Sequence, residues 1–565
     1  MSRLISATAL TIVVLCAAMT VVSDDNTTLN SMNTELDRDI KQLSLDNFEK
    51  PYFIAYTVEE DEGRFLMGRF GALIHDQPIR ERKIYADVRV GDYSFDSSMP
   101  VRRDFDSDDL FNKSYQYISA PFESDAKALR GMFWLMTDLK YKQALTDFMN
   151  KKMQAVRKIQ MPEEKSDDFT REKPLLLSEP PLSVELSKEY FADLVRRASK
   201  LLAEYRGITE SQVSCRYVTE TQYFISTEGA RIVTRNLYWA FSADATAHAA
   251  DGTPLGDSVN YYARSKEGIP KDQEMMESVD KMAKELLTLK DAPEMEPFTG
   301  PAILGPTVTG VFFHEAIGHR LEAHRTRSDE EGQTFKGKLG QEVIPKFLDV
   351  SDDPTMLRAY GSDLNGYYKV DDEGVAAQRV NLIESGVLKD FLMSRMPIPS
   401  RNKSNGHGRA SIGNHPTPRM GNLIVTAHNP VSRKTLEARL IKLAKAANVP
   451  YGLIIDTAMS GETSTDKFQF QAFLNRPILV YRVDVKTGKR TLVRGADIVG
   501  TPLLSIKNIV AAGDDYKVQN GYCGSESGFV PTSMVAPSVL VRQLELQRSA
   551  AKPSRPPILP SPFEK

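Results

Sequence analysis

The chain is interrupted near its middle by a proline- and glycine-rich stretch, residues 290–306 (KDAPEMEPFTGPAILGP). This stretch follows a run with helical periodicity, and clustered proline and glycine end regular elements. A length of 565 residues is enough for two or three ordinary domains with sizeable cores. We therefore expect an N-terminal domain over residues 24–295, a C-terminal domain over residues 296–548 and a disordered, proline-rich tail over residues 549–565.

Both halves mix helical and strand-like patterns, which predicts an α/β (α+β) fold with antiparallel or mixed sheets. Apolar residues at three- and four-residue spacing indicate helices at residues 125–158, 187–207, 272–289 and 432–448. Alternation indicates strands at residues 84–90, 379–393, 476–485 and 501–513. Short alternating runs broken by turn residues between Ser211 and Arg264 predict an antiparallel meander.

The overall composition is that of a soluble globular protein, with 41% apolar and 26% charged residues. Lysine and arginine number 72 and aspartate and glutamate 75, which gives a formal net charge of −3. This near-balance, without a basic run interleaved with aromatic residues, argues against a nucleic-acid partner.

The N-terminal segment has the features of a secretory signal peptide. Arg3 precedes an apolar run from residue 4 to 22, and an acidic stretch follows. Val21 and Ser23 occupy the two small-residue positions of a cleavage site. We expect a signal peptide over residues 1–23 and a secreted or periplasmic protein. An uncleaved membrane anchor is the alternative, since the run approaches spanning length.

Residues 312–325 (FFHEAIGHRLEAHR) hold three of the chain's eight histidines together with two glutamates. A helix is expected to begin near Thr307, directly after a glycine and a proline. At about 100° per residue, one side of such a helix is polar and the other is apolar. The polar arc contains His314, Glu315, Gly318, His319 and Glu322, and the apolar side contains Phe313, Ile317, Leu321 and His324.

A shared metal ion is one interpretation of this polar arc. Two histidines five residues apart start roughly 10 Å from each other at Cβ on an ideal helix. A π-type widening of the turn would help both imidazoles reach one ion, and Gly318 would leave that ion room near the backbone. Glu315 is placed to take a proton from a water molecule at the metal, as in HExxH zinc peptidases. The alternative is that His314 and His319 are merely solvated or hydrogen-bonded locally.

The same segment resembles the active-site helix of the TldD branch of the TldD/PmbA metallopeptidase family. That branch carries HExxxH within a context such as hydrophobic-HEAxGHxLE. The resemblance continues, in order, through residues 367–395, 405–423 and 494–541. It therefore covers nearly the whole second half of the chain.

The resemblance implies a two-domain protein with an active-site helix opening its second domain. It also implies a zinc-dependent peptidase that acts on short or unfolded chains from an enclosed dimeric cavity. The dimer would be a homodimer or a heterodimer with a PmbA-like paralogue. His314 and His319 match the family's histidine ligands of Zn2+, Glu315 the catalytic glutamate and Cys523 the third ligand. For Glu322, which also matches a family position, we expect a hydrogen bond to a histidine.

The cysteines leave alternatives open. After signal peptide cleavage Cys215 and Cys523 would remain, and two cysteines in an oxidising compartment form a disulfide by default. Alternation around Cys215 instead predicts a strand residue packed as a small hydrophobe. Cys523, flanked by glycines in NGYCGSESG, is expected in a loop that brings its thiolate to the histidines.

Two other functions compete with a zinc peptidase. One is a cysteine hydrolase with Cys523 as nucleophile, which would leave Glu315 and one histidine without a role. The other is a non-catalytic subunit that shapes a partner's chamber. His407 and His415 lie in the turn-rich stretch NGHGRASIGNHP and either line the cleft or belong to a structural loop.

Overall fold

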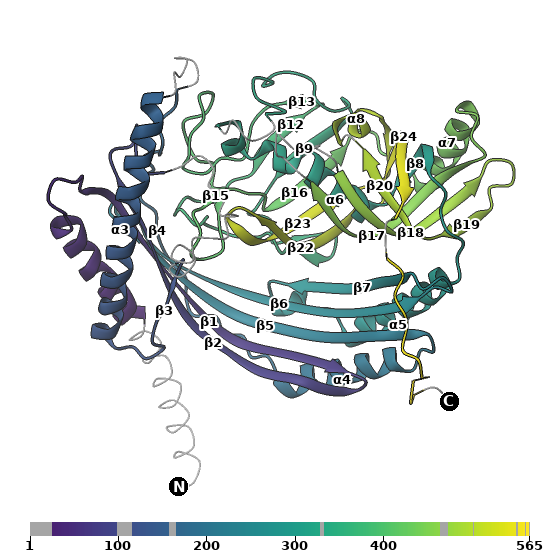
Figure 1. Cartoon of the computed structure of the whole chain (residues 1–565), viewed down its shortest axis with the longest axis horizontal. Helices are drawn as coiled ribbons and strands as arrows, with labels where there is room; N and C mark the ends of the chain where they lie inside the picture. Colours follow the sequence, from purple (N-terminus) through teal and green to yellow (C-terminus); the bar gives the residue numbers. More distant parts are fainter. Residues whose placement is uncertain are drawn as a thin grey trace, which may run out of the picture.

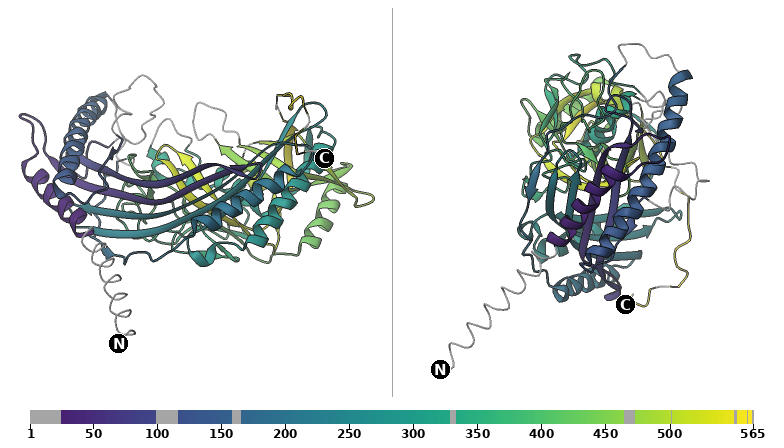
Figure 2. Two further views of the ribbon diagram at one scale, coloured as in Figure 1. Left: turned by 90° about the horizontal axis from the view of Figure 1, so that it is seen from below. Right: turned by 90° about the vertical axis from the view of Figure 1, so that its left-hand side faces the viewer.

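The structure is a computed structural model (Figure 1, Figure 2). It describes residues 25–98, 116–157, 165–327, 333–463, 473–500, 502–549, 552–559 and 561–563. The expected signal peptide lies outside the described residues. None of the helices in these ranges is both long enough and apolar enough to span a membrane.

The first half of the chain forms one large, curved sheet (Figure 1). Within the described ranges it has seven strands in the order β3-β2-β1-β5-β6-β4, with β7 also paired to β6. The predicted meander is confirmed, because β5, β6 and β7 are antiparallel neighbours. The strands are β1 (Pro51–Arg69), β2 (Ala72–Val90), β3 (Ile118–Ser119), β4 (Leu176–Ser178), β5 (Ile208–Ser226), β6 (Arg231–His248) and β7 (Pro254–Ala263).

Helices cover one face and one end of this sheet (Figure 2). They are a helix at residues 25–42, α3 (Ala126–Arg157), α4 (Lys188–Ala203), the short 3-10 helix η2 (Lys266–Gly268) and α5 (Asp272–Lys290). The Ser187 side chain caps α4 by accepting a hydrogen bond from the backbone N–H of Tyr190. The buried stripe of α5 has helical spacing, and each large apolar side chain in it contributes about 1.5–3 kcal/mol. That stripe comprises Met275, Val279, Met282, Ala283, Leu286 and Leu289.

The second half of the chain lies against the opposite face of the large sheet and contains two further sheets (Figure 1). In the described ranges, one has six strands in the order β13-β12-β9-β16-β23-β22. Its strands are β9 (Leu348–Asp352), β12 (Val380–Glu384), β13 (Val387–Leu388), β16 (Asn422–Ala427), β22 (Lys517–Ser525) and β23 (Gly528–Ala536). The β16–β23 pair is parallel and the other pairs are antiparallel, so the sheet is mixed.

The other sheet follows the order β17-β8-β24-β20-β18-β19, with β21 paired to β24. Its strands are β8 (Phe298–Leu304), β17 (Tyr451–Thr463), β18 (Phe473–Asp484), β19 (Arg490–Val493), β20 (Ala496–Gly500), β21 (Ile509–Ala512) and β24 (Val539–Arg548). The remaining elements of this half are α6 (Pro306–Ala316), η3 (Gly318–Leu321), η4 (Ala323–Arg327), β10 (Arg358–Ala359), β11 (Ser362–Asp363), β14 (Gly408–Arg409), β15 (Thr417–Pro418), α7 (Arg433–Ala446) and α8 (Pro502–Lys507). The chain is therefore a mixed α/β protein, as predicted.

One strand prediction was partly wrong. Residues 501–513 were expected to be strand-like, but α8 forms first and only β21 is a strand. A short apolar run cannot be distinguished from a buried helix by periodicity alone, and Pro502 at the first helical position favours the helix. The expected boundary between residues 295 and 296 falls between α5 and β8.

The helix α6 is held in the core between the two smaller sheets. It directly follows β8, and Val308, Phe312 and Phe313 on it are each at most 1% exposed. A Cβ atom at Gly310 would lie 2.9 Å from the Cβ of Met534 on β23. The close approach of α6 to β23 therefore requires glycine at this position, and it brings the end of α6 beneath the β22–β23 hairpin.

Candidate metal centre

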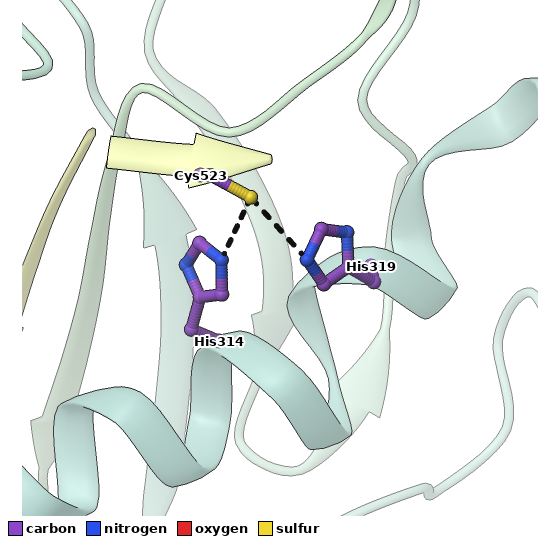
Figure 3. Close-up of side chains that lie close together, drawn as sticks. All are labelled: His314, His319 and Cys523. Atoms are coloured by element: carbon purple, nitrogen blue, oxygen red, sulfur yellow. Dashed lines mark hydrogen bonds between the residues drawn. The ribbon is translucent and has the colours of Figure 1, made fainter. Parts of the chain in front are cut away.

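The two histidines do not lie on one continuous helix, so this prediction was wrong. Helix α6 ends at Ala316, Ile317 departs from helical geometry (φ −117°, ψ −52°), and a 3-10 turn follows from Gly318. His314 is thus in the last turn of α6, and His319 is in the 3-10 turn. The helix break replaces the expected π-type widening. It brings the two imidazole centroids to 4.9 Å, with the rings perpendicular (Figure 3).

Gly318 has a different role from the one predicted for it. A Cβ atom at this position would lie only 2.0 Å from the Sδ atom of Met420, which is 1% exposed. The space beside Gly318 is therefore filled by Met420 and is not left for a metal. This contact allows the chain to turn closely at the break between His314 and His319.

Cys523 lies on strand β22, not in the predicted loop (Figure 3). It pairs with Val530 in the antiparallel β22–β23 hairpin, whose turn includes Gly528 at φ 88°. The Sγ atom of Cys523 is 3.1 Å from Nε2 of His314 and 3.3 Å from Nε2 of His319. The structure therefore brings together the three residues that the sequence singled out as metal ligands.

Burial and charge favour a thiolate in this cluster. The three residues are at most 6% exposed. Burial raises the pKa of the Cys523 thiol, but the charges of His319 and His314 outweigh burial and hold that pKa well below its usual value. Burial lowers the pKa of His319, yet the facing thiolate and Glu322 raise it well above its usual value.

The donor set fits zinc. Two imidazole nitrogens and one thiolate sulfur lie within 4.8 Å of one another, without an acidic oxygen among them. A catalytic zinc typically takes three such protein ligands and leaves a fourth position for water or substrate. His314, His319 and Cys523 could therefore hold a metal ion, and their donor atoms are of the types that zinc binds.

Glu315 lies at the edge of this donor set. Its Oε2 atom is 4.0 Å from Nε2 of His319, and its side chain is mostly buried. The Nη1 atom of Arg320 donates to the Glu315 backbone carbonyl at 2.7 Å, which fixes the turn from which the carboxylate projects. The carboxylate is thus held near the donors without being part of the donor group.

Glu322 makes the hydrogen bond expected for it. Its Oε1 atom is 3.1 Å from Nδ1 of His319, and its Oε2 atom accepts from Arg325 at 2.7 and 2.9 Å. Burial raises the pKa of Glu322, but His319 and Arg325 lower it to about 2. A carboxylate at Nδ1 keeps the proton on that nitrogen and presents the Nε2 lone pair to the cluster.

The remaining histidines of the two motifs lie elsewhere. His324 is fully buried and its Nε2 atom is paired with Glu526, a partner that sequence periodicity could not indicate. His407 is also fully buried, with Nε2 at 3.2 Å from Asp352. His415 is 60% exposed at its side chain and lies 3.9 Å from Asp87. The structure thus places His407 in a structural loop and brings none of the three into the donor group.

Cys215 and Cys523 are both free in the structure, so they do not form the disulfide that was the alternative. Cys215 is fully buried on β5, among the apolar residues beneath α4, as the strand prediction had it. Burial raises the pKa of its thiol far above the usual value. This thiol is therefore an inert core residue.

A cavity of about 420 Å³ lies between the large sheet and the second half of the chain. Tyr522 lines this cavity, whereas its neighbour Cys523 points to the histidines, because successive strand residues face opposite sides. The sheet contributes three carboxylates, those of Glu59, Asp61 and Glu220, whose oxygens lie within 4.8 Å of one another. Burial and mutual repulsion raise the pKa of Glu59 to about 7 and that of Glu220 to about 8.

These raised values predict a pH-dependent stability. Between about pH 4.5, the ordinary value for glutamate, and pH 8, the unfolded state loses the Glu220 proton and the folded state keeps it, so stability falls as pH rises. Glu220→Gln should therefore stabilise the fold more at pH 8 than at pH 5. The difference between the two pH values in its effect on the unfolding free energy should be on the order of 1 kcal/mol or more, and the melting temperature should rise accordingly. Thermal melts of this variant and of Glu274→Gln on the exposed face of α5 measure the difference. An equal effect of Glu220→Gln at both pH values would contradict this assignment.

Comparisons with known proteins find similarity to metallopeptidases. Residues 297–548 match the family model described as the PmbA/TldA metallopeptidase C-terminal domain. A metalloprotease of Methanocaldococcus jannaschii is 32% identical over 233 residues, which cover 40% of this chain and 46% of that protein. A zinc metalloprotease TldD homolog of Saccharolobus solfataricus is 30% identical over 247 residues, which cover 44% of this chain and 51% of that protein.

The matched region spans about half the length of these curated relatives. Among solved structures, TldE from Thermococcus kodakarensis has the same fold, with a TM-score of 0.61 at 12% identity. That likeness covers 92% of this chain and 100% of TldE. The second half of the chain is thus similar to the C-terminal domain of PmbA/TldA metallopeptidases and to proteins named metalloproteases, and the whole chain shares the fold of TldE.

Proposed function

We propose that the chain is a zinc-dependent peptidase of the HExxxH-bearing TldD branch, acting on short or unfolded peptides. The observation that carries this proposal is the convergence of His314, His319 and Cys523, with the Glu315 carboxylate beside them. The three convergent residues would hold the ion. A zinc ion held there supplies Lewis-acid polarisation and lowers the pKa of water.

Side chains near the donors would have the other roles in the reaction. Glu315 would accept the proton of the attacking water and deliver it to the leaving amine, a general acid–base role. Glu322 would hold His319 in the tautomer that presents Nε2. The burial of the donors would limit competing water and strengthen each electrostatic interaction.

Metal dependence tests this proposal against a cysteine hydrolase. Purified protein should contain one zinc ion per chain by native mass spectrometry, and a chelator should abolish peptide hydrolysis until zinc is restored. A cysteine hydrolase using Cys523 would instead survive the chelator and be blocked by alkylation of the free thiol. A non-catalytic subunit would show no hydrolysis with or without zinc. The same spectra report whether the chain forms the dimer that we propose from the family resemblance.

Substrate state gives a further prediction. If hydrolysis takes place within an enclosed dimeric cavity, the enzyme should cleave a denatured protein or a short peptide and leave the same protein intact when folded. Cleavage of a reduced, unfolded protein and of its native form would be compared at equal concentration by gel electrophoresis and mass spectrometry. Equal rates on the rigid native form and the unfolded form would contradict the enclosed-cavity proposal.

A further inference from the structure

Arg419 lies directly beneath the hairpin that carries Cys523. It sits in the connection between β15 and β16, and its side chain is fully buried. Its Nη2 atom donates to the Cys523 carbonyl at 2.7 Å, and its Nη1 atom donates to Ser527 Oγ at 2.9 Å and to the Gly528 carbonyl at 3.0 Å. One guanidinium thus binds the hairpin at the thiol-bearing residue and at its turn.

The same guanidinium also faces the carboxylate that orients His319. The Nε atom of Arg419 lies 3.6 Å from Oε1 of Glu322, the oxygen that is bonded to His319 Nδ1. Arg325 binds the other oxygen, so Glu322 is held between two arginines. Arg419 is therefore joined to two of the three proposed metal ligands, to Cys523 directly and to His319 through Glu322.

The position of β22 explains why this support is needed. In the described part of the chain β22 is the edge strand of its sheet, so its outer side has no neighbouring strand. In addition to its pairing with β23, β22 is held by side chains, because Arg419 donates to the Cys523 carbonyl and Asn365 donates to the Gly521 carbonyl at 2.8 Å. A cysteine side chain has a single rotatable bond to its sulfur, so the backbone position of the edge strand sets the position of the thiolate.

Arg419 is itself rigidly held. Its backbone N–H donates to the His407 carbonyl at 2.9 Å, and the N–H groups of Gly421 and Asn422 donate to Asp352 at 3.0 and 3.1 Å. The buried His407–Asp352 pair described above thus anchors the segment from which the arginine reaches the hairpin.

We propose that Arg419 is a positioning residue of the metal centre, which sets the distance between the Cys523 thiolate and the His319 imidazole. The proposal rests on the proposed zinc-binding role of His314, His319 and Cys523. Loss of the guanidinium leaves each ligand chemically intact but no longer fixed relative to the others. Losses of such supporting contacts typically weaken metal binding by about 10- to 100-fold.

The test compares three variants by competition for zinc with a chromophoric chelator. Arg419→Met should bind zinc about 10- to 100-fold more weakly than the wild type. Arg419→Lys keeps the charge but cannot span the three acceptors, so it should also bind zinc more weakly. This variant keeps the proposal testable if Arg419→Met does not fold. Arg409→Met is the matched control, because Arg409 is a buried arginine that donates to Met420 and Pro531 carbonyls without touching a ligand.

Two further readouts separate positioning from general destabilisation. Melting temperatures of the metal-free proteins show how much each substitution costs the fold, and Arg409→Met should retain its zinc affinity whatever its melting temperature. With cobalt in place of zinc, the thiolate-to-metal absorption band should weaken in both Arg419 variants and persist in the control. If both Arg419 variants bind zinc as tightly as Arg409→Met, the positioning role of Arg419 is overturned, but the proposed function is not. A wild type that binds no zinc would overturn the proposed function as well.

Discussion

Replacing Glu315 by glutamine is expected to slow peptide hydrolysis by about 10²- to 10⁴-fold while leaving the zinc content unchanged. Glutamine keeps the shape of this mostly buried side chain but cannot accept a proton from water. The metal remains because the donor group consists of His314, His319 and Cys523. Rates on a fluorogenic peptide and metal analysis of the same preparation measure both quantities.

Glu315→Asp provides the matched comparison. It keeps a carboxylate but withdraws it by one methylene, so its rate should lie between those of the wild type and Glu315→Gln. A glutamine variant that retained more than about a tenth of the wild-type rate would exclude Glu315 as the general base.

Cys523→Ser should lose most of the bound zinc and, with it, the peptidase activity. A serine hydroxyl does not ionise at neutral pH and therefore cannot replace a thiolate that the structure places 3.1 and 3.3 Å from two imidazoles. Metal content and hydrolysis would be measured on the same samples. Cys215→Ser is the control, because this buried thiol on β5 touches none of the donors, and it should keep both zinc and activity.

Thiol reactivity provides an independent check of Cys523. In zinc-loaded protein both thiols should resist alkylation, and a chelator should make Cys523 the more reactive of the two. Peptide mapping of active protein should find both thiols unpaired. A Cys215–Cys523 disulfide in that active protein would remove Cys523 from the metal centre and leave the third ligand unidentified.

Periodicity in the sequence predicted the elements whose pattern is long. Four helices and the meander of β5, β6 and β7 were found in this way, since ten or more residues of regular spacing outweigh local exceptions. The end of α6 could not be found, because it depends on the packing of Gly318 against Met420, about a hundred residues away. The strand around Cys523 was missed for a related reason, because its flanking glycines are typical of loops.

The candidate site likewise has residues that the sequence could predict and residues that it could not. Residue types and the family resemblance singled out His314, Glu315, His319 and Cys523, and the structure brings all four together. The supporting arginines gave no signal, because a buried arginine looks in sequence like any surface arginine. Each of them binds a group from a distant segment, Arg325 the carboxylate of Glu526 and Arg419 the carbonyl of Cys523, and the sequence alone does not reveal such partners.

The long separation between the donors also affects when the protein becomes competent to bind metal. His319 and Cys523 are 204 residues apart, and β22 and β23 follow nearly every other strand of the second half. During synthesis from the N-terminus, both imidazoles and Glu315 emerge long before the thiol that completes the site. Closing so long a loop also has an entropic cost that only the finished sheet can offset. A growing chain would therefore complete the proposed metal centre only after most of its second half has been synthesised.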